Sequence, residues 1–218
     1  MFANREDAAL QLAARLRERP LRHPLVLAIP RGGVVLGAVL ARELDADLDV
    51  LLARKLRAPD NPELALGAVS ETGKVYLNRE FLEPPSQTYL DRETQVQMRE
   101  IARRRRLLRS NRPPLPVADR STIIVDDGIA TGSTMIAALR ALKAQHPHEI
   151  IAAVPVAAPD RLEQIRPLCD DLICLHTAPD LFAVGQFYED FSQVDDEQVV
   201  ALMKPFLAAA NENGAATR

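Results

Sequence analysis

The chain has 218 residues, of which 47% are hydrophobic and 26% charged, and its formal net charge is −3. This balance is ordinary for a globular domain with a core of its own, and the small negative charge excludes a global attraction to nucleic acid or anionic membranes. No apolar run approaches the roughly 20 residues that cross a bilayer, and no signal-peptide pattern is present. We therefore expect a cytoplasmic protein without membrane or nucleic-acid partners, in which Cys169 and Cys174 are free thiols.

The first part of the chain predicts a helix followed by a strand–helix–strand unit. Asn4 can cap the amphipathic first helix, and Pro20 is a stop signal beyond its end. Two short apolar runs then flank a helical segment, as expected for buried parallel strands joined by a right-handed crossover. The predicted elements are a helix at 5–19, a strand at 25–29, a helix at 34–44 and a strand at 48–53.

The middle of the chain predicts a β-hairpin and a long polar helix. Strands at 66–70 and 74–77 flank the turn Glu71-Thr72-Gly73, and a helix rich in Arg, Glu and Gln follows at 86–110. Residues 56–74 carry two prolines and two glycines. Two interpretations stay open for this stretch: a lid that closes over a ligand and excludes water, or a surface excursion that contains the hairpin.

The last part of the chain continues the alternation of strands and helices. We expect strands ending at 125 and spanning 150–155 and 171–175, helices at 135–143, 160–166 and 195–210, and a disordered tail at 211–218. This alternation predicts an α/β fold in which a central, mostly parallel sheet is flanked by helices. The organisation is one domain at 1–210, interrupted by an insertion at about 56–118.

Residues 122–134, TIIVDDGIATGST, are the most informative segment. Four β-prone residues lead into the acidic pair Asp126-Asp127, and a short loop with two glycines and several hydroxyl groups precedes a helix. Backbone amides at a helix start favour a phosphate, whereas adjacent carboxylates accept hydrogen bonds from hydroxyls or bind a metal. A ribose 5-phosphate carries both kinds of group. The other interpretation is a solvated acidic turn before a capped helix.

This segment resembles the phosphoribosyl pyrophosphate (PRPP) motif of the type I phosphoribosyltransferases. The resemblance implies that Asp126 and Asp127 contact the ribose hydroxyls, with Mg²⁺ nearby as the metal that they help to hold. It also implies that the following loop wraps the 5′-phosphate through backbone amides and hydroxyls. The implied phosphate-binding residues are Ile129, Ala130, Thr131, Gly132, Ser133 and Thr134, and Gly128 before them is also expected to bind PRPP.

A second glycine loop, Pro30-Arg31-Gly32-Gly33, follows the first predicted strand and therefore faces the same sheet edge. Its glycines permit close approach to an anion, and Arg31 can bind phosphate oxygens with two hydrogen bonds. In the resembled family such a loop binds pyrophosphate, often with a cis peptide bond before the basic residue. The other interpretations are a ligand-free turn and a dinucleotide fingerprint, although the spacing G-G-x-x-x-G differs from G-x-G-x-x-G.

Two groups of basic residues accompany these loops. Arg54 and Lys55 are expected at the end of the second strand, where the resemblance implies contact with pyrophosphate; an exposed basic turn is the other interpretation. Arg103 to Arg106 lie late in the long helix and point around most of a turn. We expect them to form a solvated or inter-subunit face, although one arginine could also reach a neighbouring active site.

The segment 180–191 holds most of the aromatic residues in its part of the chain. By resemblance, peripheral elements at about 176–194 form a hood over the acceptor base, and aromatic rings in it stack on a flat heterocycle. Packing against the core explains the same residues equally well. The residues concerned are Phe182, Phe187, Tyr188 and Phe191. Together with the Pro-Arg-Gly-Gly loop, this segment extends the resemblance to a subgroup of predicted phosphoribosyltransferases with an unassigned acceptor.

The resemblance implies an enzyme of nucleotide or nucleoside metabolism that transfers 5-phosphoribosyl from PRPP to a nitrogenous base and releases pyrophosphate. Asp126, Asp127 and Arg31 would be its catalytic residues, and a homodimer is expected. Ala130 stands where hypoxanthine-type enzymes carry an aspartate that protonates the purine, which argues against that acceptor. Two alternatives remain: a non-catalytic sensor of PRPP or nucleotides on the same fold, and a dinucleotide or nucleotide-sugar binder.

Overall fold

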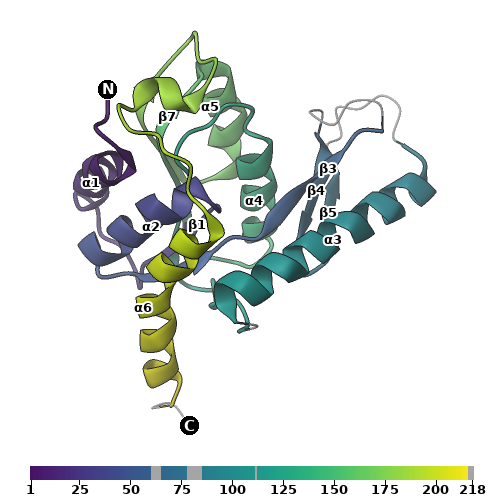
Figure 1. Cartoon of the computed structure of the whole chain (residues 1–218), viewed down its shortest axis with the longest axis horizontal. Helices are drawn as coiled ribbons and strands as arrows, with labels where there is room; N and C mark the ends of the chain where they lie inside the picture. The colour runs from purple at the N-terminus through teal and green to yellow at the C-terminus, as the bar shows by residue number, and fades with distance from the viewer. Residues whose placement is uncertain (60–64, 78–84, 111, 216–218) are drawn as a thin grey trace.

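The computed structural model describes residues 1–59, 65–77, 85–110 and 112–215, and for the side chains of 65 and 208–215 nothing is stated. Its main sheet has five strands in the order β2-β1-β6-β7-β8 (Figure 1). All neighbouring pairs are parallel. The strands are β1 (Leu25–Ala28), β2 (Asp47–Val50), β6 (Ser121–Val125), β7 (Glu149–Ala157) and β8 (Asp171–Thr177). The predicted fold class is confirmed.

Helices cover both faces of this sheet because its central strands are apolar on both sides. Every residue of β1 and β6 is buried, the pattern of parallel strands with two covered faces. One core cluster joins the sheet to α1 (Arg5–Leu16), α2 (Gly32–Glu43) and α6 (Asp196–Ala215). The other joins it to α4 (Ser133–Lys143) and α5 (Pro159–Ile165), which the short helix η1 (Arg166–Leu168) follows. Among the described residues no helix is long and apolar enough to cross a membrane.

A second, antiparallel sheet projects from the side of the first, and the long helix α3 (Gln87–Arg109) runs along it (Figure 1). Its strands are β3 (Ala53–Arg57), β4 (Ala65–Ser70) and β5 (Val75–Leu77), in that order. The predicted hairpin is confirmed as β4 and β5. Within the proposed lid at 56–74, the described residues include the end of β3, all of β4 and the turn at 71–72, and residues 60–64 lie outside the described part of the chain.

The predicted strand at 48–53 is wrong at its end, and β3 was missed. The chain leaves the main sheet after Val50 and enters the second sheet at Ala53, so the apolar run at 50–53 connects strands of two different sheets. Hydrophobic periodicity reports that a residue is buried but cannot report a change of pairing partner. Arg54 and Lys55 therefore lie within β3, opposite Val69 and Ala68, and do not end a strand of the main sheet. The insertion accordingly begins at 53.

A buried arginine fastens the end of α3 to both sheets. Arg109 Nε lies 2.6 Å from Asp49 Oδ1 of β2, and the same guanidinium also contacts Glu71 and the carbonyl of Val50. The Asp49 carboxylate further accepts the backbone N–H of Leu115 at 2.9 Å. This network fixes where the insertion sits relative to the main sheet.

The segment after β8 packs against the N-terminus. Phe2 pairs with Tyr188 in an isolated parallel bridge, and the backbone amide of Phe2 donates to the carbonyl of Phe187 at 2.8 Å. Phe187, which ends the short helix η2 (Val184–Phe187), Tyr188 and Phe191 pack around the fully buried Phe2. Core packing thus accounts for three of the four candidate aromatic residues. Phe182 is different, since 85% of it is exposed.

The remaining predicted helices and strands lie within three residues of their expected bounds, except at the C-terminal end of the last helix. Asn4 caps α1 as predicted, because its Oδ1 accepts the amide of Asp7 at 2.9 Å. The disordered tail predicted for 211–218 is wrong for 211–215, where α6 continues to Ala215. The preceding alanine run has high helix propensity, and an established helix propagates at little cost. Residues 216–218 lie outside the described part of the chain.

Candidate active site

Two loops lie in contact at the carboxyl ends of adjacent strands. Ala28 of β1 is in register with Val125 of β6, and the amide of Ile29 donates to the carbonyl of Val125 at 3.0 Å. A Cβ added at Gly33 would lie 2.8 Å from that carbonyl oxygen and 3.1 Å from Asp126 Cα. The loop at 30–33 and the acidic pair therefore occupy one site, at the sheet edge where open α/β folds bind ligands.

The Pro30–Arg31 peptide bond is cis, as the resemblance implied. Arg31 is the residue before α2, and Pro30 lines a cavity beside the loop. The Arg31 side chain is turned toward α6, where Nη1 lies 3.9 Å from Asp196 Oδ1. In this arrangement the Arg31 backbone belongs to the loop at the site, and its side chain lies near Asp196.

Asp126 is partly buried and lines the same cavity. Its Oδ1 accepts the backbone amide of Asp127 at 2.9 Å. Burial, and then the charge of Asp127, raise the pKa of the Asp126 carboxyl well above its usual value. A cationic or hydroxyl-bearing ligand would relieve this unfavourable charge, so the position favours such a ligand.

Asp127 is held by two residues from distant parts of the chain. Arg5 Nε donates to Asp127 Oδ2 at 2.8 Å, and the hydroxyl of Tyr188 donates to the Asp127 carbonyl at 2.7 Å. From the sequence, Arg5 is expected only in a helix and Tyr188 only in stacking or core packing. No local pattern could have found either contact, because Arg5 is 122 positions from Asp127 and Tyr188 is 61.

The loop after the acidic pair forms the start of α4. Its first half is fixed to β7, since the amide of Ile129 donates to the carbonyl of Val156 at 2.8 Å. Gly132 then adopts φ +76°, the left-handed region that favours glycine, and no side chain caps the helix that begins at Ser133. The first turn carries no acidic residue. An uncapped, uncharged helix start beside exposed Ala130 and Thr131 is suited to an anion.

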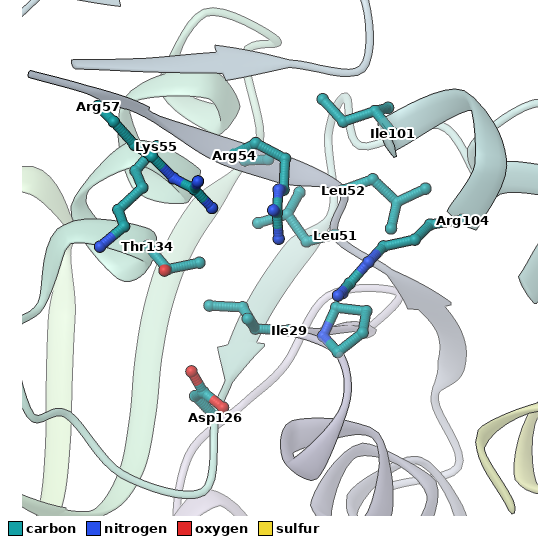
Figure 2. A pocket seen from close by; sticks show the side chains of 12 residues that line it. Ile29, Leu51, Leu52, Arg54, Lys55, Arg57, Ile101, Arg104, Asp126 and Thr134 are labelled. Atoms are coloured by element: carbon teal, nitrogen blue, oxygen red, sulfur yellow. The ribbon is translucent and has the colours of Figure 1, made fainter. Parts of the chain in front are cut away.

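A cavity of about 230 Å³ lies between the two sheets and is bordered by basic side chains. Figure 2 shows Arg54, Lys55 and Arg57 reaching into it from β3 and Arg104 from α3, with Thr134 beside Lys55 and Asp126 across the cavity. Burial, and then the charge of Arg104, lower the pKa of Arg54. Several positively charged side chains around one small cavity favour an anionic ligand, because its negative charge reduces their mutual repulsion.

The arginines at 103–106 do not share one environment. Arg104 lines the cavity of its own chain, whereas Arg103 is exposed and lies 3.6 Å from Asp196 through its Nη1 atom. The predicted solvated face is therefore wrong for Arg104. A signal existed: Gln97 and Ile101 are buried on the same helix face seven and three positions earlier, and helical spacing places Arg104 with them.

The site residues proposed from the sequence thus come together around one sheet edge, with Arg31 directed to its rim. Among the described residues no cluster of three or more His, Cys, Asp or Glu side chains could hold a metal. Mg²⁺ commonly binds through one or two carboxylates and completes its shell with water and substrate phosphates. The Asp126–Asp127 pair fits a magnesium ion of that kind.

Comparison with known families identifies the domain. Residues 3–191 match the model of the phosphoribosyl transferase domain. The chain belongs to the phosphoribosyl transferase family. The matched residues include the main sheet, the acidic pair, the second sheet and the segment that packs on Phe2.

Individual relatives extend the same result. The chain is 38% identical over 205 residues to proteins of two Mycobacterium tuberculosis strains that carry the name "Putative phosphoribosyl transferase". The match covers 93% of this chain and 46% of each relative, so the chain spans about half the length of these phosphoribosyl transferase relatives. It also resembles the crystal structure of TT1426 from Thermus thermophilus, with 40% identity and a TM-score of 0.87, over 94% of this chain and 98% of that one.

Proposed function

We propose that this protein is a phosphoribosyltransferase that uses PRPP and Mg²⁺ to transfer 5-phosphoribosyl to a nitrogenous acceptor and releases pyrophosphate. The observation that carries the proposal is the contact between the Pro30–Gly33 loop and the Asp126–Thr134 segment beside a cavity bordered by arginines. PRPP has the matching groups: a 5′-phosphate, a vicinal diol and a pyrophosphate. Membership in the phosphoribosyl transferase family supports the same reaction class.

Each part of PRPP has a counterpart in the site. The uncapped start of α4 and its hydroxyl groups would hold the 5′-phosphate, and Asp126 and Asp127 would accept hydrogen bonds from the ribose hydroxyls. The basic side chains of β3 and Arg104 would hold the pyrophosphate, and Arg31 would join them by leaving Asp196. Mg²⁺, when bound, would neutralise charge on the pyrophosphate.

In the proposed reaction the bond between ribose C1 and the pyrophosphate oxygen breaks, and the bonding electrons leave with pyrophosphate. The lone pair of an acceptor nitrogen forms the new bond to C1. Positive charge grows on the ribose ring beside the acidic pair, and negative charge grows on the leaving group beside the arginines. Charges fixed in advance at these two positions stabilise the transition state without reorganisation.

The decisive experiment is calorimetry with PRPP and Mg²⁺, followed in the same sample by a pyrophosphate-release assay across a panel of purine, pyrimidine and other heterocyclic bases. Release with one base supports the transferase and names its acceptor. Binding without release with any base favours a PRPP sensor instead, and failure to bind PRPP rejects both. The proposal includes a homodimer, which sedimentation equilibrium would test.

A matched pair of variants ties the binding signal to this site. Asp126→Asn removes a charge of the acidic pair after β6, while Asp119→Asn removes a charge from the exposed loop before the same strand. Asp119 has φ +60°, a conformation that asparagine also tolerates. We expect only Asp126→Asn to weaken PRPP binding.

A further inference from the structure

The guanidinium of Arg5 is enclosed by specific contacts, although Arg5 is the first residue of a helix at the periphery of the sheet. Its Nε donates to Asp127 Oδ2 at 2.8 Å, and its Nη1 donates to the carbonyl of Ser192 at 2.8 Å. The guanidinium lies over the ring of Phe191, with Cζ 3.8 Å from the ring centroid. Only 10% of the Arg5 side chain is exposed. Such an arrangement holds the cation in one orientation.

Asp127 is fixed on its other sides as well. Its carbonyl accepts the Tyr188 hydroxyl at 2.7 Å, and its carboxylate lies against Gly32, where an added Cβ would overlap Oδ2. The same Cβ would lie 3.1 Å from Arg5 Nε. Arg5, Asp127 and the Pro30–Gly33 loop therefore pack together, and the orientation of the Asp127 carboxylate is set before any ligand arrives.

Asp126 has a different environment, although it is the neighbouring residue. Among the described residues Asp126 forms no ion pair, and its Oδ1 accepts only a backbone amide in the hydrogen bonds that the structure shows. It faces the cavity that Thr134 and the basic side chains line. Among the described residues, Asp127 is thus hydrogen-bonded to a resident guanidinium and Asp126 is not.

We propose that Arg5 is a positioning residue that holds Asp127 as an acceptor for a ribose hydroxyl and leaves Asp126 as the carboxylate that meets the metal ion. A guanidinium already bonded to Asp127 repels a divalent cation at that carboxylate, and a carboxylate fixed in advance loses less freedom when a hydroxyl binds. This division of roles rests on the proposed function, and it goes beyond that function by assigning different tasks to the two acids.

The test compares two affinities that the proposal moves in opposite directions. In Arg5→Gln the acidic pair loses its resident cation, so Mn²⁺ alone, followed by electron paramagnetic resonance, should bind about fivefold more tightly. In the same variant the Asp127 carboxylate is free to rotate, so PRPP at saturating Mg²⁺ should bind about tenfold more weakly by calorimetry. A purely structural role would not strengthen binding of the bare metal.

Three further variants separate charge from position. Arg17→Gln removes an arginine just beyond the end of the same helix, where it pairs with Glu43, and should change neither affinity. Arg5→Lys restores the charge without the planar fork, so Mn²⁺ affinity should return toward wild type while PRPP affinity recovers only in part. Phe191→Leu keeps the cation but removes the ring beneath it, so it should weaken PRPP binding a few-fold; it also serves if Arg5→Gln fails to fold.

Each result supports or overturns the inference. Unchanged or weaker Mn²⁺ binding in Arg5→Gln overturns it, as does an equal loss of Mn²⁺ affinity in Asp126→Asn and Asp127→Asn, since the inference requires the larger loss in Asp126→Asn. Absence of Mn²⁺ binding in wild type and variant alike also overturns it. If wild type binds Mn²⁺ but not PRPP, the proposed function fails, and the metal measurements alone then decide whether Arg5 shields Asp127.

Discussion

The carboxylate of Asp127 occupies the space beside Gly32 that a side chain at position 32 would need. The acidic pair and the Pro30–Gly33 loop fit together because residue 32 has no Cβ. Arg5 also lies at this contact, because its Nε donates to Asp127 and is close to Gly32. A ligand that bridges the two loops therefore meets a surface whose parts are already fitted to each other.

Gly32→Ala should damage ligand binding more than folding. The added methyl group must displace the Asp127 carboxylate and its bond to Arg5, so PRPP affinity should fall about tenfold, measured by calorimetry. Gly37→Ala is the reciprocal control, because its Cβ would lie 2.8 Å from Ala28 Cβ and 3.0 Å from Leu48 in the core. It should lower Tm and leave PRPP affinity near wild type. Equal affinities for the two variants would contradict the importance of the Gly32 contact.

Asp126→Asn should separate binding from stability. Partial burial, and then the charge of Asp127, disfavour the charged form of Asp126, as the raised pKa of its carboxyl indicates. The neutral amide should therefore leave Tm unchanged or raise it. Loss of the carboxylate should weaken Mg²⁺–PRPP binding about tenfold or more. Thermal unfolding and calorimetry on one preparation check both. A large fall in Tm would show that Asp126 has a structural role instead.

Arg104→Gln should weaken pyrophosphate binding, because Arg104 borders the cavity together with Arg54. Its exposed neighbour Arg105 offers a matched control with the same charge on the same helix. We expect an about fivefold loss of pyrophosphate affinity for Arg104→Gln at moderate salt and almost none for Arg105→Gln. Similar losses in both variants would indicate a general electrostatic effect and not a contact in the cavity.

Arg109→Met should destabilise the protein strongly, although Arg109 itself does not line the 230 Å³ cavity. The substitution leaves the buried Asp49 carboxylate without its cation and removes the contact between α3 and Glu71. Breaking a buried ion pair on one side costs about 3 kcal/mol, which urea denaturation would measure. The double variant Arg109→Met with Asp49→Asn should recover part of this loss. Wild-type stability in the single variant would refute the anchoring role.

Glu100 should make stability sensitive to acid. Hydrogen bonds from Arg103, aided by Arg104 and opposed by partial burial, lower the pKa of Glu100 to about 2. A carboxyl with a depressed pKa stabilises the fold above its unfolded value of 4.5, and this contribution is lost as the pH falls toward 2. Wild type should therefore exceed Glu100→Gln in Tm above pH 4.5, and the difference should vanish near pH 2.

Glu18→Gln controls for a general loss of negative charge, because Glu18 is exposed just beyond α1. Its difference from wild type should stay small over the same pH range. A difference between wild type and Glu100→Gln that does not depend on pH would contradict the assigned pKa.

Much of the fold could be predicted because its signals are local. The apolar runs at β1 and β6, the Asn4 cap and the Glu71-Thr72-Gly73 turn each depend on a few neighbouring residues. The missed element, β3, differs in kind, since Ala53–Arg57 is a strand only because Ala65–Ser70 pairs with it. Strand pairing across a connection leaves no periodicity of its own in the sequence.

The candidate site divides in the same way. The two glycine loops, the acidic pair and their common sheet edge can be read from the amino-acid order alone, because a strand followed by a loop and a helix fixes where the loop points. The contacts of Arg5 and Tyr188 with Asp127, the position of Arg104 in the cavity and the approach of Arg31 to Asp196 emerge only once the chain is folded. These contacts join residues far apart in the chain, and their geometry depends on how whole elements pack.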